Sequence, residues 1–285
     1  VAVQRYLASK KVPQLFGFSG IPLFGDPKKS PWSVGFLPSY DFEGKACGKF
    51  IRANVKDPKV VMMYQNDDFG KSMLAAVKAG LGDAAKSVVK ETSYEVTDPT
   101  VDAQIIALQA TGANVFMIIG TPKHTSQAIR KSADLGWNPL KLILSGTASI
   151  PSVLKPAGLD KSIGTVAGKI LKDYSDPIWA DDAGMKRYGA FMKKYGADLD
   201  PNDNLVALGY TVAQTMAHVI KQCGDELTRE NVLNQACNLK KLVPDLMIPG
   251  VELSTTQQNR FPIHQMRMAR FDGQYWKLVG DMINE

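Results

Sequence analysis

Short apolar runs alternate with amphipathic segments between residues 60 and 170. Each run is too short for a helix and is predicted to be a buried strand. The predicted strands are Val60–Tyr64, Ser87–Val89, Val115–Ile119, Leu140–Leu144 and Gly164–Ala167. Because helical patterns separate these runs, the sequence predicts an α/β fold with a parallel sheet and right-handed crossovers.

Three of these predicted strands end in small or polar residues. The loops that follow them are residues 65–70 (Gln-Asn-Asp-Asp-Phe-Gly), 120–122 (Gly-Thr-Pro) and 145–149 (Ser-Gly-Thr-Ala-Ser). The carboxyl ends of parallel strands lie at one edge of a sheet, where ligands bind. We therefore expect the three loops to face one another and to form half of a binding site.

The segments between and outside these predicted strands are mostly helical in pattern. Residues 12–16 predict a strand, and residues 17–39 predict a long Gly/Pro-rich loop of the kind that is usually functional. Asp98-Pro99 predicts a helix start, Asp68 predicts the N-cap of a helix over residues 70–81, and Asp272-Gly273 predicts a hairpin turn. Further helices are predicted at residues 1–9, 42–54, 125–135, 181–195, 204–222 and 228–239, and an extended segment at residues 247–253.

Composition narrows the class of protein. The 285 residues are 45% hydrophobic and 22% charged, as in an ordinary globular protein. The net charge of +6 is spread over pairs such as Lys193-Lys194, which favours a solvated surface over nucleic-acid binding. The three cysteines are too sparse for a disulfide scaffold or a zinc site; Cys223 and Cys237 either pair or remain thiols.

Several motifs together resemble the type I periplasmic solute-binding proteins of ABC importers, the branched-chain amino-acid-binding superfamily. The most specific matches are to its branch for aromatic and other hydrophobic carboxylates, and the resemblance covers essentially the whole chain. The matching segments are residues 12–16 (VPQLF), 25–27 with Trp32 (GDP, W), 64–71 (YQNDDFGK), 94–100 (YEVTDPT), 153–159 (VLKPAGL) and 222–231 (QCGDELTREN).

The resemblance implies two lobes, each a parallel sheet flanked by helices, joined by three crossovers around a ligand cleft. It assigns residues 1–36 and 168–248 to lobe I, and residues 37–167 and 249–285 to lobe II. The predicted lobe I has many helices and few strands. We therefore expect lobe I to be incomplete at its N-terminus, with further strands upstream of Val1.

In the family that the sequence resembles, the loop that follows the strand at residues 12–16 binds the ligand carboxylate. Here that loop holds Gly17, Phe18 and Ser19, with Ser19 at the position of the hydroxyl donor. Glycines let backbone N–H groups approach an anion. An ordinary glycine-rich turn is the alternative. A hydrolase nucleophile elbow would need glycine where Ile21 stands.

The resemblance places further ligand contacts in lobe II, and one, Tyr210, on a helix of lobe I. Phe69 would cover the apolar part of the ligand, with core packing as its alternative. Thr121 and Tyr210 would add to the cleft, although Tyr210 could equally be buried in its helix. The loop that would complete the site has the residues Ser145, Gly146, Thr147 and Ser149. This loop has no Asp or Glu to pair with a ligand ammonium, which favours a carboxylate without an amino group.

The sequence thus predicts a monomeric, non-enzymatic periplasmic protein that closes on a small hydrophobic or aromatic carboxylate and delivers it to ABC importer membrane subunits. No cofactor, metal or nucleic acid is expected, and no signal peptide is present in this chain. One rival is a branched-chain amino-acid-binding protein, if a carboxylate such as Asp67 reaches the cleft. Other rivals are a ligand sensor or regulator and a hydrolase with Ser19 as its nucleophile.

Overall fold

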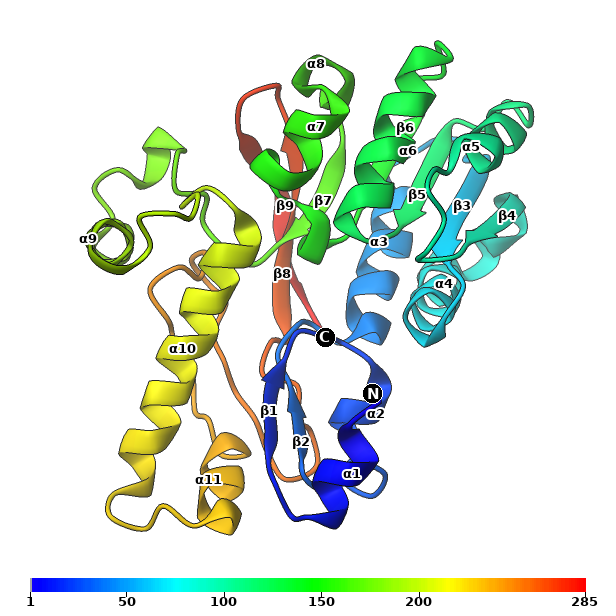
Figure 1. The fold of residues 1–285 in the computed structure, drawn as a ribbon. Coiled ribbons are helices and arrows are strands. Elements are labelled where there is room, and N and C mark those ends of the chain that lie inside the picture. The colour runs from blue at the N-terminus through cyan, green and yellow to red at the C-terminus, as the bar shows by residue number, and fades with distance from the viewer. Residues whose placement is uncertain (1) are drawn as a thin grey trace.

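The computed structural model describes residues 2–285, and the first residue of the predicted helix 1–9 lies outside them. Figure 1 shows two lobes joined by several chain connections. The helices are α1 (Gln4–Ser9), α2 (Pro22–Gly25), α3 (Tyr40–Asn54), α4 (Asp68–Leu81), α5 (Asp102–Gln109), α6 (Pro122–Asp134), α7 (Lys155–Ala157), α8 (Leu159–Ser162), α9 (Ala183–Tyr195), α10 (Asn204–Cys223) and α11 (Arg229–Ala236). The strands are β1 (Gln14–Gly17), β2 (Ser33–Gly35), β3 (Val60–Gln65), β4 (Val88–Tyr94), β5 (Val115–Ile119), β6 (Leu140–Ile143), β7 (Val166–Lys169), β8 (Gln265–Phe271) and β9 (Trp276–Asn284).

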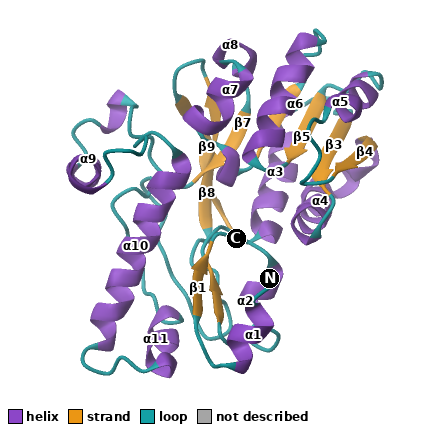
Figure 2. Ribbon diagram, in the orientation of Figure 1, coloured by secondary structure: helices purple, strands orange, loops and turns teal. Residues whose placement is uncertain are grey.

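The first lobe, called the sheet lobe here, is built on a seven-stranded sheet (Figure 2). Its strand order is β4-β3-β5-β6-β7-β8-β9. The first five strands pair in parallel, as the alternating pattern predicted. The hairpin β8–β9 then adds two antiparallel strands beside β7. The C-terminal part of the chain therefore completes a sheet that begins some 200 residues earlier.

Burial on both faces explains why β3 and β5 have apolar residues at consecutive positions. Val60 and Met62 of β3 pack with helices α3 and α4, whereas Val61 and Met63 pack on the opposite face with α5 and α6. All four side chains are completely buried. A strand covered on both faces needs apolar residues at consecutive positions, and this produces the continuous runs in the sequence.

The second lobe contains β1, β2 and helices α9, α10 and α11. Strands β1 and β2 pair in parallel, with Leu15 opposite Val34. Its core includes Tyr188 of α9, Leu208 and Val219 of α10, and Leu233 of α11. Much of this lobe is irregular chain, so helix packing supplies more of its core than strand pairing does.

Two predicted local features are wrong. Residues 98–101 are not helical, and α5 begins at Asp102 with Val101 as its N-cap. The Asp98 carboxylate instead accepts a hydrogen bond from the Glu95 backbone N–H at 2.9 Å, so it closes a turn with the preceding residues. The predicted loop 17–39 contains α2 and β2, because its three-residue strand is too short to show a periodic pattern.

Other boundaries also differ from prediction. The hairpin predicted from Asp272-Gly273 is formed, and its second strand runs from Trp276 to Asn284. Residues 247–253 form only isolated bridges, such as the one between Leu171 and Met247. All three cysteines are buried free thiols, so Cys223 and Cys237 do not pair. Among residues 2–285, no helix has the length and apolarity to cross a bilayer.

Candidate functional site

A cavity of about 250 Å³ lies at the carboxyl edge of the parallel strands. The ends of β3, β5 and β6 meet there, together with the starts of helices α3, α4 and α6. The residues that line it are Phe18, Leu37, Tyr40, Glu43, Gln65, Asp67, Phe69, Gly120, Thr121, Pro122, Leu144, Gly146 and Thr147. The three loops predicted to face one another therefore do meet in space.

Half of the predicted site residues line this cavity: Phe18, Phe69, Thr121, Gly146 and Thr147. The other half do not: Gly17, Ser19, Ser145, Ser149 and Tyr210. Ser19 and Ser145 of the second group hydrogen-bond to two other residues that line the cavity, Tyr40 and Glu43.

Ser19 supports the cavity wall indirectly. Its hydroxyl lies 3.3 Å from the hydroxyl of Tyr40, which lines the cavity, and accepts the Ile21 backbone N–H at 3.2 Å. Gly17 contributes its carbonyl, which accepts the backbone N–H groups of Ser19 and Phe36. No histidine hydrogen-bonds to Ser19 within the part of the chain that the structure describes. A Ser–His nucleophile pair is therefore not formed.

Tyr210 lies away from the cavity. Its hydroxyl donates to Asp245 at 2.9 Å, and its ring contacts Tyr188 and Phe191. Burial is the main reason that the pKa of Tyr210 is raised, to about 12, so the hydroxyl remains a donor. Tyr210 could either contact the cleft or be buried from its helix; the structure shows it packed between α10 and the aromatic side chains of α9.

Three aromatic rings give the cavity its apolar wall. Tyr40 and Phe69 have ring centroids 5.1 Å apart, and their planes are tilted by 55°. Phe18 comes from the other lobe and is 54% exposed. It faces Gly146, where an added Cβ atom would lie 3.4 Å from the Phe18 ring. Gly146 therefore leaves room between the two lobes.

The starts of three helices lie at the cavity, and their partial positive charges favour an anionic group. Helix α3 is capped by Ser39, whose hydroxyl accepts the Phe42 N–H at 3.1 Å. Helix α4 is capped by Asp67, which accepts the Gly70 N–H at 3.0 Å, so the prediction of Asp68 as its cap was off by one residue. Helix α6 has no side-chain cap at Thr121. The first N–H groups of α6, which like those of any helix have no intrahelical acceptor, therefore also lack a capping side chain.

A hydrogen-bond network fixes the position of Thr121. The Thr121 backbone N–H donates to the hydroxyl of Tyr94 at 3.0 Å, and that hydroxyl donates to Gln65 at 3.3 Å. Gln65 in turn donates to Asp67 at 2.6 Å. The Thr121 hydroxyl lies 3.0 Å from Nδ1 of His124. The polar side of the cavity is thus held before any ligand arrives.

Two carboxyl groups line the cavity, and none of the lining side chains is Lys, Arg or His. Asp67 is exposed and lines the cavity, which is the position that the amino-acid-binding rival required of it. Glu43, which sequence reasoning missed, is 2% exposed and accepts the backbone N–H of Ser145. Burial raises the pKa of Glu43. The only sequence signal for Glu43 was an acidic residue on the apolar face of its helix.

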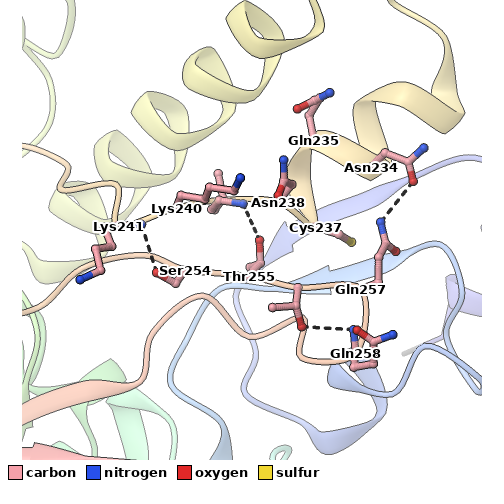
Figure 3. Close-up of a pocket in the computed structure, with 12 residues that line it drawn as sticks. Asn234, Gln235, Cys237, Asn238, Lys240, Lys241, Ser254, Thr255, Gln257 and Gln258 are labelled. Carbon is pink, nitrogen blue, oxygen red and sulfur yellow. Dashed lines mark hydrogen bonds between the residues drawn. The ribbon is translucent and has the colours of Figure 1, made fainter.

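A separate depression of about 800 Å³ lies in the second lobe between the end of α11 and residues 254–258 (Figure 3). Its side chains are mostly amides, hydroxyls and lysines. Gln257 donates to Asn234 at 3.3 Å, and the Thr255 hydroxyl accepts the Leu239 N–H at 2.9 Å. It contains none of the predicted site residues.

Solved structures share this architecture. A branched-chain amino acid ABC transporter protein from Thermus thermophilus with bound valine matches with a TM-score of 0.84 and 16% identity, over 100% of this chain and 75% of that one. A substrate-binding periplasmic protein from Ralstonia solanacearum matches with a TM-score of 0.83 and 20% identity, over 100% and 76%. A leucine-binding protein from Thermotoga maritima matches with a TM-score of 0.75 and 14% identity, over 99% and 76%. No curated protein sequence matches the chain.

The fold and the cavity define a two-lobed α/β binding protein. A family model described as "Periplasmic binding protein" matches residues 1–275. The chain therefore belongs to the periplasmic binding protein family and is a binding protein rather than an enzyme. It spans about three quarters of the length of the solved relatives.

Proposed function

We propose that this chain is the periplasmic solute-binding component of an ABC importer and that it binds a small hydrophobic carboxylate in the cavity at the sheet edge. The observation that carries the proposal is the cavity itself, whose wall combines aromatic rings with the starts of three helices. An apolar pocket with a few fixed polar groups is the usual form of a small-molecule site.

The uncapped start of α6 supports a carboxylate in the ligand. Thr121 and Pro122 line the cavity at the start of α6, where the positive end of the helix dipole attracts an anion. Phe18, Tyr40 and Phe69 would cover the apolar part of the ligand, whether aromatic or aliphatic. Ser145, Ser149 and Tyr210 are not included in this proposal, because they do not line the cavity.

A branched-chain amino acid is the second candidate, favoured by Glu43 and Asp67. The sequence argument against an ammonium group considered only the loop 145–149 and the residues next to it. The structure brings two carboxyl groups to the cavity from other segments, so that argument no longer holds. An ammonium group would give these acids a partner of opposite charge. The Thermus protein with bound valine has the same fold and supports testing this candidate.

The mode of action also belongs to the proposal. The chain would act as a monomer, with residues 1–36 and 168–248 closing on residues 37–167 and 249–285. Phe18 supports this scheme, since it is the second lobe's contribution to the cavity and faces Gly146 across the gap. The membrane subunits of the importer would be its protein partners.

Isothermal titration calorimetry tests both candidates. The panel is benzoate, phenylpropanoate, a branched aliphatic acid, and the amino acids Leu, Ile and Val. Tight binding of the acids alone would support the first candidate, and tight binding of the amino acids would support the second. Phe69→Ala should weaken whichever ligand binds by about tenfold or more, equal to about 1.4 kcal/mol.

The matched control is Phe191→Ala, because Phe191 is 42% exposed on α9 and does not line the cavity. This variant should bind like the original protein. Equal losses in the two variants would contradict the assignment of the site to this cavity, and no binding across the panel would contradict the ligand class.

A further inference from the structure

The loop that follows β6 contacts the second lobe through a cluster of hydrogen bonds. The hydroxyls of Ser149 and Ser152 both donate to one carboxylate oxygen of Asp203, at 3.1 and 3.4 Å. The side-chain amide of Asn204 donates to the carbonyl of Ser145 at 3.3 Å. Two residues at the start of α10 thus hold three residues of one loop.

The two sides of this cluster belong to different hydrophobic cores. Val153 and Leu154, next to the loop, are buried in a core of the sheet lobe. Leu208, one turn into α10, is buried in the core of the second lobe. The turn before α10 is also fixed there, since the Tyr188 hydroxyl donates to the carbonyl of Pro201 at 3.1 Å. A movement of one lobe away from the other would therefore break these bonds.

The chemistry of the cluster suits a reversible contact. The Asp203 carboxylate is partly buried, and the same oxygen accepts the Leu205 N–H at 2.9 Å as the cap of α10. Hydrogen bonds to a charged acceptor are stronger than those between neutral groups. Ser149 is 1% exposed, so its hydroxyl is shielded from competing water in this arrangement.

The same loop also forms part of the cavity. Gly146 and Thr147 line the cavity, and the Ser145 N–H donates to Glu43 in its wall. One short segment therefore contacts the cavity on one side and the second lobe on the other. This arrangement explains why Ser149, which matched a ligand-contact loop by sequence, does not line the cavity.

We propose that Ser149, Ser152, Asp203 and Asn204 form a latch that holds the two lobes closed over the cavity. The latch rests on the proposed function in that the cavity between the lobes binds a small solute. Its residues set the affinity for that solute without touching it, by setting how much of the protein is closed.

The latch is tested by the distance between the lobes in ligand-free protein. Spin labels on the exposed positions of Asp160→Cys in α8 and Lys221→Cys in α10 report this distance by pulsed electron resonance, and the three native cysteines are buried. Asp203→Ala, Ser149→Ala and Asn204→Ala should each shift the distances to longer values. Asn204→Ala leaves the Asp203 cap intact, so its effect does not depend on unfolding of the helix start.

The matched control is Asp200→Ala. Among residues 2–285, the Asp200 carboxylate accepts hydrogen bonds only from Asn202 in its own loop, so the distances should not change. Unchanged distances in both Asn204→Ala and Asp203→Ala would overturn the latch. A shift of the same size in Asp200→Ala would also overturn it.

Affinity gives a second readout, with valine and benzoate as the probes. Whichever probe binds the original protein should bind Asn204→Ala about tenfold more weakly, equal to about 1.4 kcal/mol. If neither probe binds the original protein, the proposed ligand class fails, and the distance measurement alone still decides the latch.

Discussion

The two sides of the cavity differ in how they are built. The sheet lobe and the connection leading into it supply every lining residue except Phe18, and a hydrogen-bond network holds that side in place. The second lobe contributes one half-exposed ring. The wall of the cavity on the sheet edge is therefore already in place without a ligand, whereas Phe18 would reach its final position when the second lobe moves. Under the proposed function, selectivity would therefore reside mainly in the sheet lobe.

The largest expected effect comes from weakening the core behind the prepared wall. Ile118 is completely buried in β5, so Ile118→Ala should lower the free energy of unfolding by about 2–5 kcal/mol. Urea unfolding measures the loss. Ile106→Ala is the control, because Ile106 is 49% exposed on α5 and should change stability by no more than about 0.5 kcal/mol. Similar losses in both variants would contradict the burial argument.

Filling the gap between the two sides should abolish binding without unfolding the protein. Gly146→Leu would place a side chain against Phe18 and Leu37, and we expect affinity to fall by at least about 100-fold, or about 2.7 kcal/mol. Calorimetry with whichever acid or amino acid binds the original protein measures this loss. Gly209→Leu is the control, since nothing lies within 4 Å of a Cβ at that position. Retained affinity in Gly146→Leu would show that the ligand binds elsewhere.

Glu43 allows the prepared wall to be tested by pH. Burial raises the pKa of Glu43, so the folded state holds this proton more tightly than the unfolded state. Its contribution to stability is therefore present at acidic pH and is lost as pH rises above the ordinary pKa of a glutamate. Glu43→Gln removes that loss, so the variant should gain stability relative to the original protein between pH 4 and pH 8.

Urea unfolding at the two pH values measures this difference. Gln keeps an oxygen that can accept the Ser145 N–H, so the local hydrogen bond can be retained. A Glu43→Gln variant whose relative stability does not change with pH would show that Glu43 titrates normally.

The smallest expected effect lies at the connections between the lobes. The hydrogen bond that His264 donates to Glu285 is the main cause of the raised pKa of His264, and Glu285 also accepts a hydrogen bond from Ser39. This stabilisation is present below about pH 6.5 and is lost as pH rises through the raised pKa. His264→Gln should thus cost about 0.5–1 kcal/mol at pH 5.5 and less at pH 8.5. Denaturant unfolding at both pH values checks this; an equal cost at the two would contradict it.

Much of the sheet lobe could be predicted because its signals are local. The runs at β3 and β5 are apolar at every position because both faces of each strand are covered, and this pattern can be read from neighbouring residues. The meeting of the loops 65–70, 120–122 and 145–149 followed from the same pattern. The two wrong helix starts arose because neighbouring groups compete for the same hydrogen bonds. The Asp98 carboxylate accepts the preceding Glu95 N–H instead of capping a helix, and Asp67 rather than Asp68 caps α4.

The sequence by itself determined the α/β class, the order of the sheet-lobe elements and the loops that form the cavity edge, since strand and helix periodicities are short-range properties. Only the tertiary structure decided which side chains reach the cavity. Glu43 reaches it because α3 packs across the sheet, and Tyr210 does not because it bonds to Asp245, 35 residues further along the chain. Such contacts depend on how distant segments pack together, and no local pattern in the sequence records them.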